Sequence, residues 1–330
     1  MTVVARDDDF EASNRLRELG CKLKLVSISD GFWGVLWLSV YINLQYVRFN
    51  FGSNKPKNCI HFLTVAIMLS PIIWCMRNKN NWVSIEGLGS WATSNSRLKF
   101  VRYFLIRQNI ILTFTNLDEQ KRFDCQRSRL LGGIGVATNK YDICKSFNRR
   151  EIGYFGRLLK DKGIFDVIRL AREIKRRSLP LSVIVYGERY PNNPSSLSEN
   201  DLIEIGYELD GYLHFRGFTA DVNHAFSTIA CLVLPSKREG FPVVVMEASA
   251  CGVPSICYNV PGCQDAVTEG VNGFLIAEGD IETFIRTAIE VASSSEHQQS
   301  QFSDSCRRFA LQNFDDKIYV DKVLKIISDL

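Results

Sequence analysis

Two glutamates in the C-terminal half have the type and spacing to bind different parts of one polar ligand. Glu239 follows an apolar run that ends at Pro235, and Glu247 lies eight positions further along the chain. A helix expected to begin near Pro242 carries Glu247 about two turns in, and its free N–H groups at the start suit a phosphate. Gly240 lets a ligand approach the backbone closely. Taken alone, the pair fits equally well a helix with a dipole-favourable glutamate at its start and an exposed one on its surface.

The elements that must position these glutamates alternate between short apolar strands and amphipathic helices. This alternation predicts an α/β fold with a parallel sheet covered on both faces, in which ligands lie beyond the carboxyl ends of the strands. The predicted strands are Glu151–Phe155, Leu181–Tyr186, Leu213–Arg216, Cys231–Pro235, Pro254–Tyr258 and Gly273–Ile276. The predicted helices are Ile164–Arg177, Ala220–Ile229 and Val243–Cys251, with three more near 281–295, 298–312 and 316–330.

The N-terminal half also reads as α/β, with four predicted strands and helical stretches between them. These strands are Leu23–Ile28, Asn58–Phe62, Trp82–Ile85 and Ile110–Thr115. We therefore expect two doubly wound domains that meet at a cleft, with the boundary in the polar, basic stretch Phe147–Arg150. The predicted division is 1–148, 149–312 and a terminal helix over 313–330 that packs back towards the N-terminal domain.

Charge is distributed unevenly between the two halves. Residues 1–150 contain 22 Lys and Arg against 11 Asp and Glu, whereas residues 151–330 contain 18 against 25. A basic half suggests an anionic partner, such as nucleic acid or a charged membrane surface, but a solvated surface without a partner has the same composition. No recognisable nucleic-acid-binding motif accompanies the basic residues, so no nucleic-acid partner is expected. The ten cysteines form no CxxC pair or zinc-spaced cluster, and they read as buried side chains in a reducing compartment.

Two uncharged runs, Phe32–Val47 and Cys59–Met76, approach the length of a membrane span. Polar residues interrupt both, and we favour a buried strand followed by a buried helix. The first residues lack a basic segment before an apolar stretch, so no signal peptide is expected. Asp7-Asp8-Asp9 superficially resembles a metal-binding motif, but it precedes the amphipathic stretch Phe10–Leu19 and reads as the start of a helix.

The stretch around the two glutamates resembles the signature of glycosyltransferase family 4, whose retaining enzymes have the two-domain GT-B fold. Glu239 and Glu247 match its E-x7-E motif, and Gly156 to Gly163 looks like its diphosphate-binding turn. The resemblance covers roughly residues 151–290, and it continues through these segments: Ala248-Ser249-Ala250-Cys251-Gly252-Val253-Pro254, Val260-Pro261-Gly262-Cys263-Gln264-Asp265 and Glu269-Gly270-Val271-Asn272-Gly273-Phe274-Leu275.

This resemblance implies a role for each matching position. Arg157 and Lys162 would hold the donor diphosphate and stabilise the charge that develops on the leaving group. Glu239 would bind hydroxyls of the transferred sugar, and Glu247 those of the ribose. The remaining implied donor-binding positions are Gly156, Gly240, Phe241, Pro242, Val243 and Val244. No metal or other cofactor is expected, because the basic pair takes the place of a cation.

The N-terminal half more weakly resembles the branch of family 4 that extends undecaprenyl-diphosphate-linked sugars on the cytoplasmic face of bacterial membranes. The matching segments are Val4-Ala5-Arg6-Asp7-Asp8, Ile85-Glu86-Gly87-Leu88-Gly89, Leu112 to Glu119 and Gly132 to Val136. His61 matches a family histidine that could contact the transferred sugar, although it equally fits a satisfied histidine at a strand end. Relatives begin with a strand, a glycine-containing loop and a helix before the segment that matches Thr2–Asp8, so this chain is expected to lack that unit.

The sequence thus predicts a retaining glycosyltransferase that moves a hexose or N-acetylhexosamine from a UDP-sugar. The expected acceptor is a lipid-diphosphate-linked or polysaccharide glycan of O-antigen or capsule synthesis. The expected location is the cytoplasm, peripheral on the inner face of the plasma membrane. Two alternatives remain at this point: a truncated, inactive nucleotide-sugar-binding remnant, and a GT-B nucleotide-sugar epimerase.

Overall fold

A computed structural model describes the fold of the chain. The described residues are 2–6, 17–18, 22–26, 40, 44, 59–62, 81–85, 111–143, 148–191 and 193–328. The chain forms two compact units: an N-terminal unit of residues 1–113, 125–127 and 330, and a C-terminal unit of residues 114–124 and 128–329. The predicted domain boundaries near 148 and 312 stay predictions.

The N-terminal unit contains parallel strand pairs. Strand β1 (Thr2–Arg6) pairs with β2 (Lys22–Val26), and β3 (Cys59–Phe62) pairs with β4 (Asn81–Ile85). The second sheet continues from β4 to β5 (Ile111–Phe114). The short strand β6 (Ser128–Leu130) belongs to the C-terminal unit. The four strands predicted in this half are therefore present, and every end lies within two residues of its predicted bound. Asp7-Asp8-Asp9 and most of the two uncharged runs lie outside the described residues.

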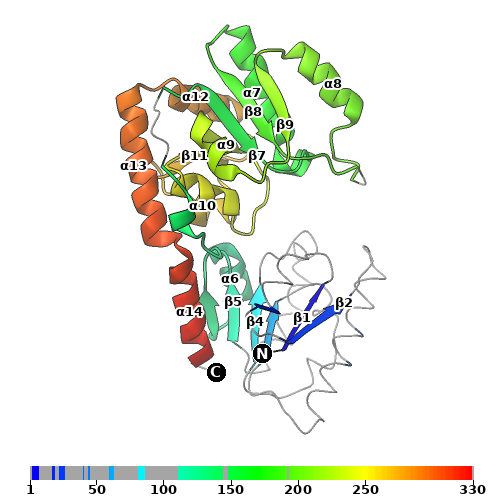
Figure 1. The fold of residues 1–330 in the computed structure, drawn as a ribbon, viewed down its shortest axis with the longest axis vertical. Helices are drawn as coiled ribbons and strands as arrows, with labels where there is room; N and C mark the ends of the chain where they lie inside the picture. Colours follow the sequence, from blue (N-terminus) through cyan, green and yellow to red (C-terminus); the bar gives the residue numbers. More distant parts are fainter. Residues whose placement is uncertain are drawn as a thin grey trace. The chain divides into compact units, whose positions relative to one another are not determined.

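The C-terminal unit is built on a six-stranded parallel sheet, drawn in green to yellow in the upper part of Figure 1. The strand order is β12-β11-β10-β7-β8-β9. The chain runs outward from β7 to β9, returns to the centre at β10 and runs outward again to β12. The strands are β7 (Glu151–Phe155), β8 (Ser182–Tyr186), β9 (Leu213–Gly217), β10 (Ile229–Leu234), β11 (Ser255–Tyr258) and β12 (Gly273–Ile276).

A helix follows each strand of this sheet along the chain. These helices are α7 (Ile164–Arg176), α8 (Glu199–Glu208), α9 (Val222–Thr228), α10 (Val243–Ala250), α11 (Cys263–Ala266) and α12 (Ile281–Ala292). Helix α6 (Leu117–Phe123) precedes them in the chain, and α13 (Glu296–Asn313) and α14 (Asp316–Ser328) come after them. Two short 3₁₀ turns, η2 (Thr138–Lys140) and η3 (Lys160–Lys162), lie in the connections. Helices α7 and α12 contact each other and the central strands, so they cover one face of the sheet.

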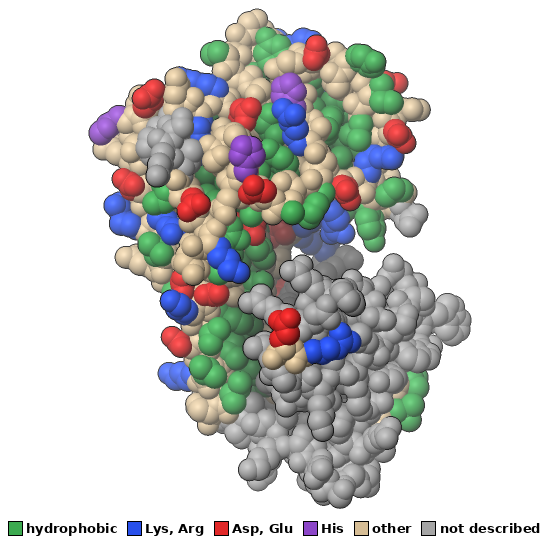
Figure 2. Space-filling view, in the orientation of Figure 1, with side chains coloured by type: hydrophobic (Ala, Val, Ile, Leu, Met, Phe, Trp, Pro, Cys, Tyr) green, Lys and Arg blue, Asp and Glu red, His purple; other side chains and the backbone are tan. Residues whose placement is uncertain are grey.

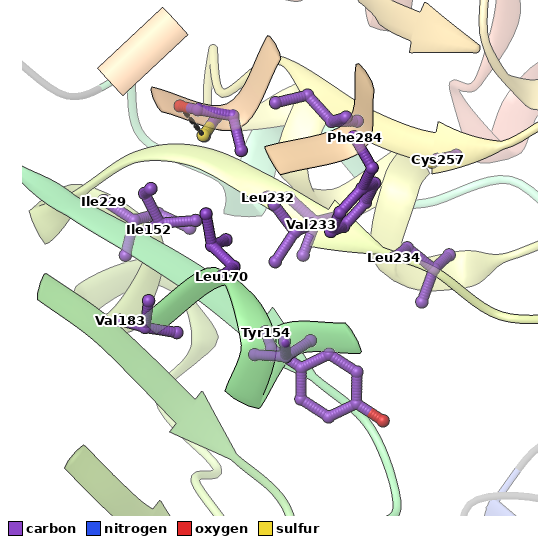
Figure 3. Packing of buried hydrophobic residues seen from close by; sticks show 14 of the residues in the cluster. Ile152, Tyr154, Leu170, Val183, Ile229, Leu232, Val233, Leu234, Cys257 and Phe284 are labelled. Carbon is purple, nitrogen blue, oxygen red and sulfur yellow. Dashed lines mark hydrogen bonds between the residues drawn. The ribbon is translucent and has the colours of Figure 1, made fainter. Parts of the chain in front are cut away.

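The core of the C-terminal unit explains why these segments fold as they do. All six residues of β10 are buried, as expected for the continuous apolar run of a central parallel strand. Helix α7 buries residues spaced three or four apart, among them Ile164, Val167, Ile168 and Ala171, so that one stripe faces the sheet. Figure 3 shows Ile152, Leu170, Leu232 and Phe284 in this shared core.

Two predictions along this half need correction. The helix predicted to end at Ile229 ends at Thr228, because Ile229 is fully buried and pairs with Glu151 as the first residue of β10. Helix α8 was not predicted, although a capping box marks its start: the Ser198 hydroxyl accepts from the Asp201 N–H, and the Asp201 carboxylate accepts from the Ser198 N–H.

Charged side chains of both signs lie at the surface of the C-terminal unit. Figure 2 shows acidic and basic side chains interspersed on the visible face of the C-terminal unit. Among the described helices, none is both long enough and apolar enough to cross a membrane.

Candidate functional site

The sheet topology brings two loops together at the centre of the C-terminal unit. Strands β7 and β10 are neighbours, and the strand order reverses between them. The β7 loop (residues 156–163) and the β10 loop (residues 235–242) follow the carboxyl ends of these two parallel strands. The two loops therefore begin next to each other. In doubly wound sheets this switch point is where ligands bind.

A direct ion pair joins the two loops. The Lys162 ammonium lies 2.8 Å from Oε1 of Glu239, and the two side chains are 25% and 14% exposed. The Lys237 N–H also donates to the Asp161 carbonyl at 3.0 Å. Because both groups of the ion pair are partly withdrawn from water, the pair is screened less than a surface pair. The topology thus brings together two predicted site residues that lie 77 positions apart.

The buried side chain of Tyr154 holds the backbone of the β7 loop by hydrogen bonds. Its hydroxyl donates to the Arg157 carbonyl at 2.9 Å and lies 3.3 Å from that of Lys162. Burial raises the pKa of Tyr154, the charge of Glu239 raises it further, and Arg157 lowers it. Both charges therefore act on the same hydroxyl, which in Figure 3 points away from the packed side chains of the core.

Arg157 is exposed, and its guanidinium carbon lies 5.6 Å from the centre of the Tyr190 ring. This contact is a cation–π interaction at the surface, which leaves the guanidinium accessible to an anion. Arg157 and Lys162 belong to the same short loop, so both cations lie at the carboxyl end of β7.

The start of α10 presents backbone N–H groups in the β10 loop. Pro242 is the N-cap and provides no side-chain cap, and the Val245 N–H donates back to the Pro242 carbonyl. The N–H groups of Val243 and Val244 precede the first intrahelical bonds and carry the positive end of the helix dipole. The Phe241 ring packs edge-on against Phe314, with centroids 6.0 Å apart, so this side chain has a packing role.

The backbone of the β10 loop is held from two sides. The Asn116 amide donates to the Gly240 carbonyl at 3.0 Å. Gly262 has a φ of +85°, and a Cβ there would lie 2.6 Å from the carbonyl oxygens of Glu239 and Gly240. Only glycine permits both this conformation and this approach. Asn116 and Gly262 therefore hold the loop that carries Glu239 in place.

Glu247 lies on α10, about two turns from its start. The Tyr141 hydroxyl donates to its Oε1 at 3.0 Å. Burial raises the pKa of Glu247, and the bond from Tyr141 partly offsets this. A carboxylate with one committed oxygen still has capacity to accept hydrogen bonds from further hydroxyls.

The structure thus places all the predicted C-terminal site residues on the β7 loop, the β10 loop and α10. His61 lies in β3, opposite Val83 of β4, and its side chain lies outside the described residues. The sequence analysis missed Tyr141 and Tyr154. Tyr141 had no local signal, because its partner lies 106 residues away, whereas a strand-end tyrosine before a Gly-bounded turn could have indicated Tyr154.

Chemically, this arrangement combines two cations, a helix start and two carboxylates. Such a set suits a ligand that carries both phosphate and hydroxyl groups. Within the described ranges, no group of three or more His, Cys, Asp or Glu side chains could hold a metal ion. The absence of a metal requirement stays a prediction.

Comparison with known proteins identifies the family that this chain matches and the proteins that it resembles. The family model for glycosyl transferases group 1 matches residues 143–307. The capsular polysaccharide biosynthesis glycosyltransferase CapM of Staphylococcus aureus is 30% identical over 167 residues, which are 51% of this chain and 43% of that protein. The UDP-Gal:alpha-D-GlcNAc-diphosphoundecaprenol alpha-1,3-galactosyltransferase of Escherichia coli is 30% identical over 135 residues, 40% of this chain and 34% of that protein. Matches to these two relatives therefore span less than half of their length.

One relative matches over nearly the whole chain. The N,N'-diacetylbacillosaminyl-diphospho-undecaprenol alpha-1,3-N-acetylgalactosaminyltransferase of Campylobacter jejuni is 27% identical over 98% of this chain and 89% of its own length. Among solved structures, Anabaena Alr3699/HepE in complex with UDP has a TM-score of 0.75 at 18% identity, covering 99% of this chain and 92% of that one. The sucrose-phosphate synthase of Thermosynechococcus elongatus has a TM-score of 0.74 at 15% identity, covering 98% of each. These likenesses confirm the predicted α/β GT-B fold.

Proposed function

The chain belongs to the glycosyl transferases of group 1, and from this premise we propose that it is a retaining glycosyltransferase that uses a UDP-sugar. The observation that carries the proposal is the Lys162–Glu239 ion pair at the sheet's switch point. It puts a phosphate-binding cation beside a hydroxyl-binding carboxylate. That is the juxtaposition a nucleoside diphosphate sugar requires at its sugar–phosphate bond.

The donor lies across the carboxyl ends of β7 and β10. Arg157, Lys162 and the N–H groups at the start of α10 bind the diphosphate, Glu239 binds the transferred sugar, and Glu247 binds the ribose. When the donor enters, the Lys162 ammonium is shared between the Glu239 carboxylate and a phosphate oxygen. The uracil assignment is supported by the UDP named in the Anabaena complex and by the UDP-Gal donor of the Escherichia coli relative.

Transfer breaks the bond between the sugar C1 and the β-phosphate oxygen and forms a bond from C1 to an acceptor hydroxyl oxygen on the same face. The leaving phosphate oxygen takes the acceptor proton. Negative charge accumulates on the diphosphate as the bond breaks, and Arg157 and Lys162 stabilise it in the transition state. With these cations in place, no metal or other cofactor takes part.

The transferred sugar is a hexose or N-acetylhexosamine, and the acceptor is a lipid-diphosphate-linked or polysaccharide glycan of a bacterial surface polymer. The relatives support this acceptor class, because two are named for diphospho-undecaprenol substrates and a third for capsular polysaccharide. The excess of basic residues in the first 150 positions favours peripheral binding to the anionic inner face of the plasma membrane, without a nucleic-acid partner.

The test compares wild type with Arg157→Ala and Glu247→Ala in the full-length protein. The assay measures UDP release from a panel of UDP-hexoses and UDP-N-acetylhexosamines with a polyprenyl-diphosphate-linked acceptor, and mass spectrometry identifies the product. We expect each substitution to reduce transfer by at least about 100-fold, as is typical when a group that stabilises developing charge or orients a substrate is lost.

Arg172→Ala is the matched control. Arg172 is an exposed α7 arginine that pairs with Glu208 at 2.6 Å, and its loss should leave transfer unchanged. Unchanged turnover in both site variants would contradict the proposal. Release of a free epimerised sugar in the absence of an acceptor would also contradict the proposal.

A further inference from the structure

The segment that carries Tyr141 is docked onto α10 by several hydrogen bonds. Tyr141 follows η2, and its hydroxyl reaches Oε1 of Glu247 at 3.0 Å. Its ring is partly buried against the apolar cores on either side of α10. The hydroxyl is thus a fixed donor, because the ring that bears it is held by packing.

Arg307 of α13 braces this segment against the end of α10. One terminal guanidinium nitrogen lies 3.0 Å from the Thr138 carbonyl, 3.1 Å from the Tyr141 carbonyl and 2.6 Å from the Ala250 carbonyl. The first residue of η2, the residue that follows η2 and the last residue of α10 are therefore tied to one charged group. This fixes the backbone of Tyr141 relative to the helix that carries Glu247.

Asn223 at the start of α9 adds a second brace. Its amide nitrogen donates to the Lys140 carbonyl at 2.6 Å, and its amide oxygen accepts from the Asp142 N–H at 3.3 Å. The residues on both sides of Tyr141 are therefore held from a different element. A side chain supported this way has little freedom to leave Glu247.

The bond has a consequence for what Glu247 can recognise. A free glutamate side chain samples several rotamers, and it loses that freedom when it binds a ligand. Here one oxygen is committed to Tyr141, so the carboxylate is held in one orientation before any ligand arrives. Its remaining lone pairs then face in fixed directions, which suits the recognition of neighbouring hydroxyl groups on a rigid ring.

We propose that Tyr141 is a positioning residue that orients Glu247 for the ribose hydroxyls of the donor, and so determines the preference of the site for ribose over deoxyribose. The inference rests on the proposed function, in which Glu247 is the ribose ligand. It makes the segment after η2 part of the donor site's specificity, although Tyr141 itself need not touch the nucleotide.

The experiment measures the dissociation constants of UDP and 2′-deoxy-UDP by calorimetry for wild type and Tyr141→Phe. The phenylalanine keeps the packed ring and removes only the hydroxyl. We expect UDP to bind about 3- to 10-fold more weakly, as for the loss of one hydrogen bond to a charged partner. Binding of 2′-deoxy-UDP should change less, so the ratio of the 2′-deoxy-UDP dissociation constant to that of UDP should decrease. An unchanged ratio of the two constants would overturn the inference.

Tyr258→Phe is the matched control. The Tyr258 hydroxyl donates to the Asp166 carboxylate at 2.9 Å, so this variant loses the same kind of bond away from the proposed ribose site. It should leave both dissociation constants unchanged. If it narrows the ribose preference as much as Tyr141→Phe does, the effect is a general loss of structure and the inference fails.

Glu247→Ala separates failure of the inference from failure of the proposed function. If Glu247→Ala leaves the ribose preference intact, the ribose assignment falls, and the inference with it. If Glu247→Ala abolishes the preference but Tyr141→Phe does not change it, only the inference falls. With Glu247 already replaced by Ala, adding Tyr141→Phe should have no further effect on UDP binding, because the coupled partner is gone.

Discussion

At the scale of single residues, two glutamates of one motif occupy different environments. Glu239 is paired with a lysine, whereas Glu247 is buried beside a tyrosine hydroxyl. The ion pair holds Glu239 next to the expected sugar–phosphate bond. Burial raises the pKa of Glu247, so its charge is more easily lost on acidification than that of an ordinary glutamate.

This difference predicts a pH dependence of donor binding. A glutamate ordinarily titrates near about 4.3, and the raised pKa of Glu247 means that it takes up a proton at a higher pH as the solution is acidified. A protonated carboxyl accepts hydrogen bonds from ribose less well, so affinity for a UDP-sugar should fall as pH is lowered from about 7.5 to 5. Calorimetry with a UDP-sugar measures this without the terminal phosphate ionisation of UDP.

Glu247→Gln is the control for this titration. It keeps the size of the side chain and removes the ionisable group, so its weaker binding should be nearly independent of pH over the same range. An equal pH dependence in both proteins would assign the titration to another group.

At the scale of elements, the β7 loop depends on one glycine. Gly163 ends η3 and precedes α7 with a φ of +81°, and a Cβ there would lie 2.1 Å from the Pro235 carbonyl oxygen. The turn that carries Arg157 and Lys162 is thus pressed against the start of the β10 loop. A side chain at this position would force the two loops apart.

Gly163→Ala should therefore destabilise the protein by about 2–4 kcal/mol, from the left-handed backbone and the steric overlap together. It should also weaken UDP binding, because the Lys162–Glu239 contact depends on the same approach of the loops. Urea denaturation measures the free energy of unfolding. Gly206→Ala in α8 is the control: a Cβ there meets no atom within 4 Å, and it should stabilise the helix by about 0.5–1 kcal/mol. Equal stability of both variants would show that the Pro235 contact is unimportant.

At the scale of the whole molecule, charge is the property that the two halves do not share. The first 150 residues have twice as many basic as acidic residues, and the remainder has an acidic excess. A chain with this distribution should approach an anionic surface with its basic half first, since electrostatic attraction acts before contact.

The full-length protein should therefore co-sediment with vesicles that contain phosphatidylglycerol and much less with pure phosphatidylcholine vesicles. Binding should fall steeply as the ionic strength is raised to about 1 M, where the Debye length is only about 3 Å. Equal binding to both vesicle types, or binding that is independent of salt, would contradict an electrostatic membrane contact. The acidic excess of residues 151–330 should make a membrane role of that half negligible.

Most of the secondary structure of the C-terminal half could be predicted from the sequence. Central strands such as β10 are continuous apolar runs, and helices such as α7 repeat apolar residues every three or four positions, so local pattern and final burial agree. The predicted end of α9 was wrong, because Ile229 pairs with β7 and the helix therefore ends at Thr228. The motif around Glu239 and Glu247 also predicted the candidate site, because glycine, proline and charged residues at strand ends are local signals.

Which of these residues contact one another depends on the packing of distant segments. The contacts of Lys162 with Glu239 and of Tyr141 with Glu247 join positions 77 and 106 apart, and no periodicity along the chain encodes such pairs. They arise because the return of the chain from β9 to β10 makes β7 and β10 neighbours, and because α13 brings Arg307 back to the segment after η2. Local propensity sets the elements, whereas the order of strands and the packing of distant segments set the distances on which the chemistry depends.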